Sequence, residues 1–241
     1  MKVYKTPRPM KAFLTLSIIF LLSTELSGQQ WGLGFQSNLG FPVGKLKEGS
    51  PGIVIPEFST VGYYEFWNLP INLGLSIGYG IYGTELEKRR DLYAGFNDQL
   101  RLRRNNNSLT IMALFRYLPE VSWKLKPFVE LQGGTNYLYT RYKISESRFE
   151  EPIEEGRDHA DWIGALRFGG GFKIPFKNPE FGFFEFKVIY QETKPVEYLR
   201  RGDVEFVPDR DGGQFNFQVR KSNFNFIQPG IGFVLYFHEE F

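Results

Sequence analysis

The chain contains no cysteine and only two histidines among its 241 residues. Without cysteine it cannot form a disulfide scaffold, an iron–sulfur centre, a cysteine-ligated zinc site or a thiol nucleophile. Two histidines leave little for a histidine-based metal centre, so the sequence predicts no metal and no cofactor. The mean hydropathy of −0.30 excludes a helical membrane bundle. It does not exclude a β-barrel, because barrel strands alternate apolar and polar residues and their hydropathies average out.

Glycine, phenylalanine and tyrosine are abundant instead, with 26, 25 and 13 copies, and aromatic residues make up 17% of the chain. A charged fraction of 23% together with these aromatics excludes a disordered tail. The length fits one domain, because an all-β barrel can occupy a chain of this size. The formal charge of +2 would suit an anionic partner only if the basic residues lie in the mature protein.

Residues 1–28 have the pattern of a secretory signal peptide: a basic stretch, an apolar run from Ala12 to Leu22, then small and polar residues. The run is about half of the ~20 residues that a membrane-spanning helix needs. Met10 begins a signal of more usual length, which leaves the start codon open between Met1 and Met10. Without residues 1–28 the chain has 25 basic and 26 acidic residues, from 29 − 4 and 27 − 1. The net charge becomes −1, so no nucleic-acid footprint remains.

Residues 29–241 are predicted to form one all-β domain, because apolar and polar residues alternate with a period of two almost to the end. In the clearest segment, 71–83, Ile and Leu fall on one face while Gly, Ser and Asn fall on the other. Eight strands are expected, an even number as bacterial membrane barrels have. Their approximate ranges are 31–41, 53–67, 71–83, 108–118, 124–143, 162–174, 182–192 and 223–237.

The connections alternate strictly between short and long. The links at 68–70, 119–123 and 175–181 are short, whereas those at 42–52, 84–107, 144–161 and 193–222 are long and charged. A transmembrane β-barrel shows this alternation, with short turns in the periplasm and long loops outside. The prediction is therefore an eight-stranded antiparallel up-and-down transmembrane barrel with both chain ends in the periplasm.

The charged residues inside the predicted strands mostly share the polar face, which would line the lumen. Four acids and four bases can pair there, as charges removed from water require: Glu57, Glu65, Arg116, Glu130, Arg167, Lys173, Glu185 and Lys187.

The opposite face is apolar and rich in aromatics, many of them near strand ends, where interfacial girdles of membrane barrels lie. The residues expected to face lipid are Phe58, Tyr64, Phe66, Leu109, Ile111, Phe115, Tyr117, Val129, Leu131, Tyr137, Tyr139, Trp162, Leu166, Phe168, Phe172, Phe184, Phe186, Val188 and Tyr190.

The last strand, IQPGIGFVLYF, places Phe233, Leu235 and Phe237 on one face, and Phe241 ends the chain in the same parity. This resembles the C-terminal signal that the barrel assembly machinery reads, with Phe237 or Phe241 as the terminal aromatic. The whole mature chain resembles the small outer-membrane barrels of the PorT-like, OmpX-like type common in the Bacteroidota. The segment 125–139 is similar to that family's strand after a periplasmic proline turn. The resemblance implies an outer-membrane location and carries over no functional residue; some family members assist a secretion apparatus.

Two glycine-rich segments are candidates for ligand sites. Gly169–Gly171 and Gly212-Gly213 lack the strand-loop-helix context of a phosphate loop and are predicted to be strand and turn positions. Asp209–Gly212 lacks the remaining ligands of a calcium loop and is predicted to be a turn.

A lipid-modifying hydrolase or acyltransferase is the main enzymatic alternative. His159 would be its base, in a predicted loop beside Asp158 and Asp161, with Ser145 or Ser147 as nucleophile. His238 falls on the periplasmic side, and the carboxylates of 150–155 are expected to be a solvated acidic loop.

The predicted loops differ in charge. Residues 85–104 contain six basic and four acidic side chains, and residues 146–161 contain seven acidic and two basic. These loops either pair with each other or the basic one contacts lipopolysaccharide phosphates through Arg101, Arg103 and Arg104.

The predicted function is that of a non-enzymatic integral outer-membrane protein, a structural or interaction protein of the envelope or an accessory of a secretion complex. A monomeric barrel with a filled lumen is expected. Its partners would be lipopolysaccharide, the barrel assembly machinery and possible envelope or secretion-complex proteins. The third alternative is a secreted, soluble barrel that binds an apolar ligand.

Overall fold

The computed structural model describes residues 30–50, 52–66, 68–93, 98–207 and 214–237. The predicted signal segment 1–28, the Gly212-Gly213 turn, His238 and Phe241 lie outside these ranges. No helix among the described residues is both long and apolar enough to cross a membrane.

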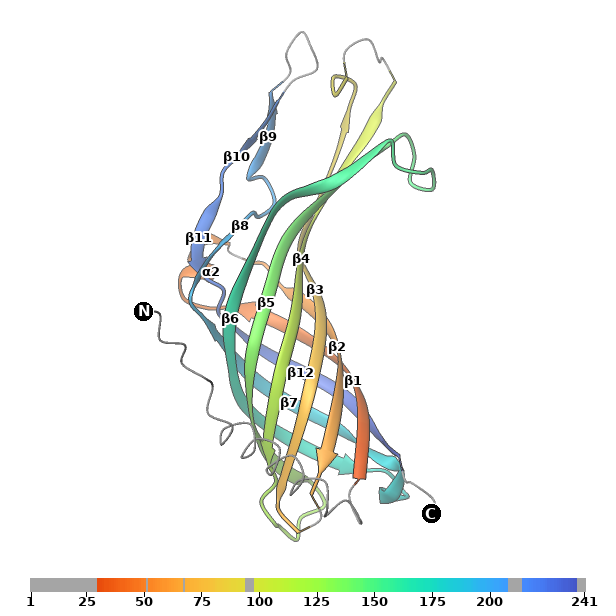
Figure 1. Ribbon diagram of the computed structural model, residues 1–241, viewed down its shortest axis with the longest axis vertical. Helices are drawn as coiled ribbons and strands as arrows, with labels where there is room; N and C mark the ends of the chain where they lie inside the picture. The colour runs from red at the N-terminus through yellow and green to blue at the C-terminus, as the bar shows by residue number, and fades with distance from the viewer. Residues whose placement is uncertain (1–29, 51, 67, 94–97, 208–213, 238–241) are drawn as a thin grey trace, which may run out of the picture.

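Eight antiparallel strands close into a barrel (Figure 1) in the order β1-β12-β7-β6-β5-β4-β3-β2. This confirms the predicted eight-stranded up-and-down topology. The bounds are β1 Gln30–Pro42, β2 Ile55–Glu65, β3 Ile71–Arg89, β4 Leu100–Tyr117, β5 Lys126–Ser145, β6 Glu154–Pro175, β7 Gly182–Thr193 and β12 Phe226–Phe237. Closure comes from β1 and β12, where Trp31 pairs with Phe237 and Phe41 with Ile227.

The short links gather at one end, here called the turn end, where β1 begins and β12 ends (Figure 1). One of these links contains a single 3₁₀ turn, η1 (Pro179–Phe181). At the other end β3, β4, β5 and β6 continue beyond the barrel as a curved four-stranded sheet, here called the extension.

The extension corrects two predicted loops. Much of 84–107 and 144–161 is strand, because β3 runs to Arg89, β4 starts at Leu100, β5 ends at Ser145 and β6 starts at Glu154. The physical reason is that the alternation continues: Leu100, Leu102 and Ile144 are buried on one face, whereas Arg101, Arg103 and Lys143 lie on the other.

The other two long connections also contain structure. The link after β1 includes a short helix, α2 (Lys45–Gly49). The link after β7 contains β8 (Pro195–Tyr198), β9 (Val204–Val207), β10 (Gln214–Phe217) and β11 (Arg220–Asn223). These form two small antiparallel sheets, β9 with β10 and β8 with β11. The β9–β10 pair lies alongside the extension (Figure 1).

The glycine run in β6 belongs to the barrel wall, as the sequence indicated. A Cβ on Gly169 would collide with the backbone oxygen of Val188, and one on Gly171 with that of Phe186. These glycines let β6 approach β7 closely, since a backbone oxygen cannot move aside as a flexible side chain would.

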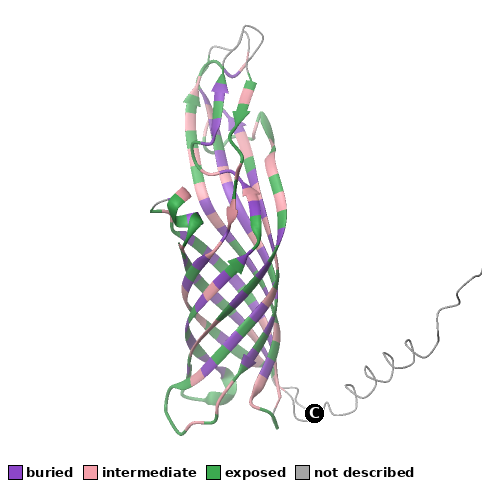
Figure 2. Cartoon of the chain, turned by 90° about the vertical axis from the view of Figure 1, so that its left-hand side faces the viewer, coloured by how far each residue is buried: buried purple, intermediate pink, exposed green. Residues whose placement is uncertain are grey.

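Polarity is inverted relative to a water-soluble barrel. Exposed and buried residues alternate along the strands (Figure 2). The exposed positions are apolar, with Leu75 at 65% and Phe58 at 66% exposure, whereas the buried positions include many polar and charged residues. None of the nineteen residues expected to face lipid is buried.

Candidate functional site

The centre of the lumen holds a network of charged side chains around Arg116 on β4. Its Nε lies 2.9 Å from Oε2 of Glu130, and its Nη1 lies 2.9 Å from Oε2 of Glu185. Its Nη2 donates to Tyr63 Oη at 2.7 Å and also to Glu130. All four side chains are at most 1% exposed. One guanidinium thus joins strands β2, β4, β5 and β7.

The guanidinium of Arg116 is also enclosed by two aromatic rings. Its Cζ lies 3.9 Å from the ring centroid of Phe128 and 4.6 Å from that of Tyr63. A cation stacked on aromatic faces in a desolvated site gains electrostatic attraction in addition to its ion pairs. The network therefore holds Arg116 by two carboxylates, a hydroxyl and two ring faces.

The remaining predicted lumen charges pair along the barrel. Arg167 donates to both carboxylate oxygens of Glu57 at 3.0 and 2.8 Å, a bidentate pair. Lys187 Nζ lies 3.2 Å from Oε1 of Glu130. The structure thus brings Glu57, Arg116, Glu130, Arg167, Glu185 and Lys187 together inside the barrel, each with an oppositely charged partner.

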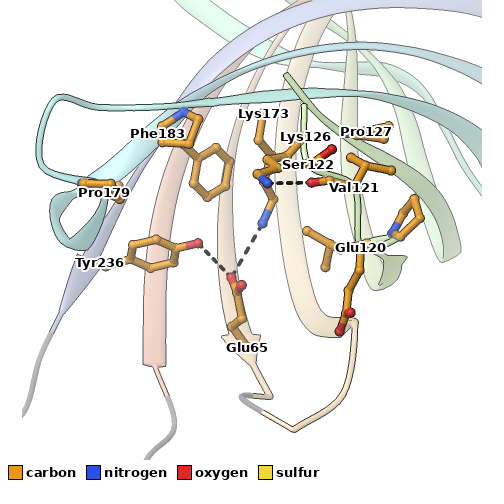
Figure 3. A pocket seen from close by; sticks show the side chains of 14 residues that line it. Glu65, Glu120, Val121, Ser122, Lys126, Pro127, Lys173, Pro179, Phe183 and Tyr236 are labelled. Atoms are coloured by element: carbon orange, nitrogen blue, oxygen red, sulfur yellow. Dashed lines mark hydrogen bonds and ion pairs between the residues drawn. The ribbon is translucent and has the colours of Figure 1, made fainter. Parts of the chain in front are cut away.

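The last two predicted lumen residues lie at the turn end (Figure 3). Lys173 Nζ is 3.5 Å from Oε2 of Glu65, which also accepts a hydrogen bond from Tyr236 Oη at 2.7 Å. The Lys173 ammonium lies 4.3 Å from the ring centroid of Phe183. These groups line a recess of about 520 Å³. Glu65 is half-buried, so this pair meets water at the barrel mouth.

Two apolar clusters fill the lumen beside the charged side chains. In the first, Val61, Leu114 and Val234 are at most 3% exposed and pack with Tyr63 and Phe183. At the extension end β8, β12 and α2 contribute to a second apolar cluster that covers the lumen. Its members are Leu46, Ile55, Tyr82, Leu138, Ile163, Val196, Tyr198, Phe224 and Phe226. Charges and apolar clusters together fill the interior.

Sequence reasoning missed the neutral members of the network. Gln36 and Gln132 donate to Glu185 and Glu130, and Gln191 accepts from Arg167 Nε at 2.7 Å. All three lie on the polar face of the alternation, which was the available signal. Tyr63 and Phe128 were harder to find, because an aromatic residue in the lumen breaks the rule that aromatics face outward.

The three arginines that were predicted to act together are divided between the two faces of β4. Arg104 points into the extension, is 3% exposed, and its Nε lies 3.0 Å from Asp158 Oδ2. Its Cζ stacks 4.5 Å from the ring centroid of Phe215 on β10. Arg101 and Arg103 lie on the opposite, outer face. Arg104 therefore belongs to the packing of the extension and is not available for a lipid contact.

Inside the extension an apolar cluster joins β4 and β5 to the β9–β10 pair through Leu100, Leu102, Ile144 and Phe206. Arg89 contributes in the same way as Arg104, with its Cζ 4.6 Å from the ring centroid of Phe206. The link after β7 is thus fastened to the extended strands by aromatic, cationic and apolar contacts.

Glu154 in the extension accepts hydrogen bonds from Tyr93 Oη at 2.6 Å and Tyr142 Oη at 2.7 Å. These bonds lower the pKa of Glu154 below its ordinary value of 4.5, and the one from Tyr142 raises the pKa of that tyrosine to about 12. Because the pKa of Glu154 is lower in the folded than in the unfolded protein, the hydrogen bonds stabilise the fold at pH values above the unfolded-state pKa. This stabilisation is lost as the pH falls through the folded-state pKa.

The Tyr142→Phe variant is expected to raise the pKa of Glu154 toward 4.5, since one of its two donors is removed. Carbon-detected NMR titration of the Glu154 carboxyl in wild type and variant measures this directly. An unchanged pKa would show that the Tyr142 hydrogen bond does not form in solution.

His159 lies on β6 and not in a loop, which corrects that prediction. Its Nε2 is 3.1 Å from the backbone oxygen of Glu197, and Asp161 accepts from the Glu197 backbone N–H at 3.2 Å. Ser145 Oγ donates to the Ser147 carbonyl. His159 and Asp161 thus dock β8 onto β6, and within the described residues neither Ser145 nor Ser147 is hydrogen-bonded to His159.

In the closing strand β12, Phe233, Leu235 and Phe237 are 37%, 40% and 54% exposed and point outward. They lie on the outer surface of the closed barrel, and their part in a C-terminal assembly signal stays a prediction. Phe241, the other predicted member of the C-terminal signal, lies outside the described residues.

Taken together, fold and site define a small closed antiparallel barrel with an apolar exterior and a charge-filled interior. No protein-family model matches the sequence, and no curated protein matches it. Among solved structures the chain is similar to a major outer-membrane protein of Thermus thermophilus, with 12% identity and a TM-score of 0.47 over 86% of this chain and 99% of that one.

Two other similar structures are Neisserial surface protein A and Ail, the attachment invasion locus protein of Yersinia pestis. The first has 9% identity and a TM-score of 0.43 over 88% of this chain and 98% of that one. The second, in a complex with the heparin analogue sucrose octasulfate, has 14% identity and a TM-score of 0.37 over 87% of this chain and 97% of that one. The barrel architecture itself follows from the strand order and registers of this chain.

Proposed function

We propose that the protein is an integral outer-membrane β-barrel with a closed lumen. It would act without catalysis, as a structural or interaction protein of the envelope or as an accessory of a secretion complex. The observation that carries this proposal is the inverted polarity of the barrel: large apolar side chains outside, and paired charges inside. In water that surface would drive aggregation, whereas in a bilayer lipid is its solvent.

The orientation follows from the two ends. Short turns face the periplasm in outer-membrane barrels and long connections face outside, so the turn end would be periplasmic and the extension extracellular. Both described chain ends lie at the turn end and would be periplasmic. The PorT-like, OmpX-like assignment stays part of this proposal, supported by the alternation and the outward apolar face of β12.

The extension is the element that we expect to interact with other molecules. Its four strands and the β9–β10 pair fasten to one another through buried contacts such as Arg104 with Asp158 and Phe215. A partner would meet a preformed surface and so would lose less ordering entropy than a flexible loop requires.

A diffusive pore is not expected. Eight strands enclose an interior just wide enough for side chains, and here it is occupied by the charge network and the two apolar clusters. In planar bilayers the purified protein should therefore give no steady, high conductance. A sixteen-stranded porin, whose lumen is an aqueous channel, would serve as the positive reference, and steady conductance of this protein would contradict the closed lumen.

A further inference from the structure

The outer face of the extension carries six cations in three cross-strand pairs. In register, Arg141 on β5 faces Arg157 on β6, Arg103 on β4 faces Lys143 on β5, and Lys88 on β3 faces Arg101 on β4. Lys88, Arg103, Arg141 and Arg157 are exposed, and the other two are half-buried. These six residues are here called the basic face.

Like charges directly opposite each other in a sheet destabilise it, so three such pairs on one face need a reason. The described strands place most of their acids on the other face, where Asp158 pairs with Arg104 and Glu154 accepts from two tyrosines. Among the described residues, the basic face holds a single ion pair, between Arg141 and Glu155 at 2.8 Å. The outer face of the extension is therefore mostly basic and the inner face holds most of the acids. The near-equal numbers of basic and acidic residues in the sequence do not reveal this separation.

An aromatic stack lies where the basic face meets the apolar exterior of the barrel. Tyr137 stacks on Trp162 with ring centroids 4.5 Å apart and on Tyr139 at 5.1 Å. Arg157 Nη1 donates to Tyr137 Oη at 3.0 Å, so the lowest cation pair touches these rings. From Arg141 to Ser145, which pairs with Arg101, the face rises about 14 Å along the strand.

Aromatic side chains of membrane barrels lie at the level of the headgroups. Given the membrane placement proposed above, on which this inference rests, the basic face begins at the headgroups of the outer leaflet and continues outward. We propose that it binds the phosphates of the phosphorylated saccharide headgroup of lipopolysaccharide. Arginine forks suit phosphate bidentately, and the anions would relieve the repulsion within each cation pair.

This assignment redefines the predicted lipid contact. Arg104 is removed from it, because that side chain is buried against Asp158 and Phe215. Lys88, Arg141, Lys143 and Arg157 are added, since strand pairing aligns them with Arg101 and Arg103. No run in the sequence could show this, because the six cations come from four different strands.

The test uses the full mature protein, refolded in detergent and incubated with bisphosphorylated lipid A, with bound lipid counted by native mass spectrometry. In the double variant R103Q/K143Q, lipid A affinity should fall about tenfold or more, because charge-assisted hydrogen bonds to phosphate are lost. The matched control is K124Q/K177Q, which removes the same charge from exposed lysines at the turn end. Its affinity should equal that of wild type.

A second lipid and a second variant sharpen the result. Monophosphoryl lipid A should bind more weakly than the bisphosphorylated form to wild type, and R103K should retain more affinity than R103Q. Equal lipid A affinity of R103Q/K143Q and wild type would overturn the inference while leaving the barrel proposal intact. Preferential binding of soluble heparin over lipid A would overturn the lipid assignment in favour of a soluble polyanion.

Failure of the membrane proposal has a separate signature. Folded outer-membrane barrels resist protease in lipid vesicles, and both the wild type and R103Q/K143Q should do so here. Wild type that stays soluble without detergent would contradict membrane insertion, whatever its affinity for lipid A.

Discussion

Replacing Arg116 with methionine is expected to destabilise the barrel by about 3–5 kcal/mol, because it leaves two buried carboxylates without their shared cation. Glu130 and Glu185 both pair with this guanidinium, and all three side chains are fully enclosed. Among the described residues, Glu130 would keep only Lys187 as a cationic partner. Equilibrium urea unfolding in lipid vesicles, followed by tryptophan fluorescence, measures the loss.

The matched control is Arg90→Met, which removes the same side chain from an exposed position directly after β3. Its effect should stay within about 0.5 kcal/mol. Restoring neutrality in the triple variant Arg116→Met, Glu130→Gln and Glu185→Gln should recover part of the loss, since neither carboxylate is then left without its cation. Equal stability of Arg116→Met and Arg90→Met would show that water reaches the network and screens it.

The barrel could be predicted from the sequence because its strands obey one simple rule, alternation with a period of two. Leu73, Leu75 and Ile77 lie outside while Asn72 and Ser76 lie inside, as the pattern indicated. The same rule placed the charged residues of the strands on the inner face. What it could not supply was their pairing, since Glu57 and Arg167 are 110 positions apart and meet only across the closed barrel.

The extension was harder to predict for a physical reason. Beyond the barrel the pattern reverses: Arg101 and Arg103 point outward, whereas Leu100 and Leu102 point inward. The density of charged residues in these strands then resembles that of a solvated loop, although the period-two alternation continues. The bulge between Thr140 and Arg141 further shifts the register, which turns Asp158 inward toward Arg104.

The second large effect distinguishes a membrane barrel from a soluble one. Leu75 lies at the middle of the outward apolar row of β3 and is 65% exposed. In water, an exposed leucine replaced by arginine would change stability by no more than about 0.5 kcal/mol. At the bilayer midplane the same change costs about 2–4 kcal/mol. We expect Leu75→Arg to show the larger loss when unfolded from lipid vesicles.

The control for this prediction is Leu69→Arg, because Leu69 is 53% exposed but lies in the turn between β2 and β3. A charge there would stay in water at the turn end and should cost little. The difference between the two variants therefore reports the depth of Leu75 in the bilayer and not the general effect of an added arginine. Equal, small losses for both would mean that the apolar exterior does not face lipid, and the secreted soluble barrel would become the better account.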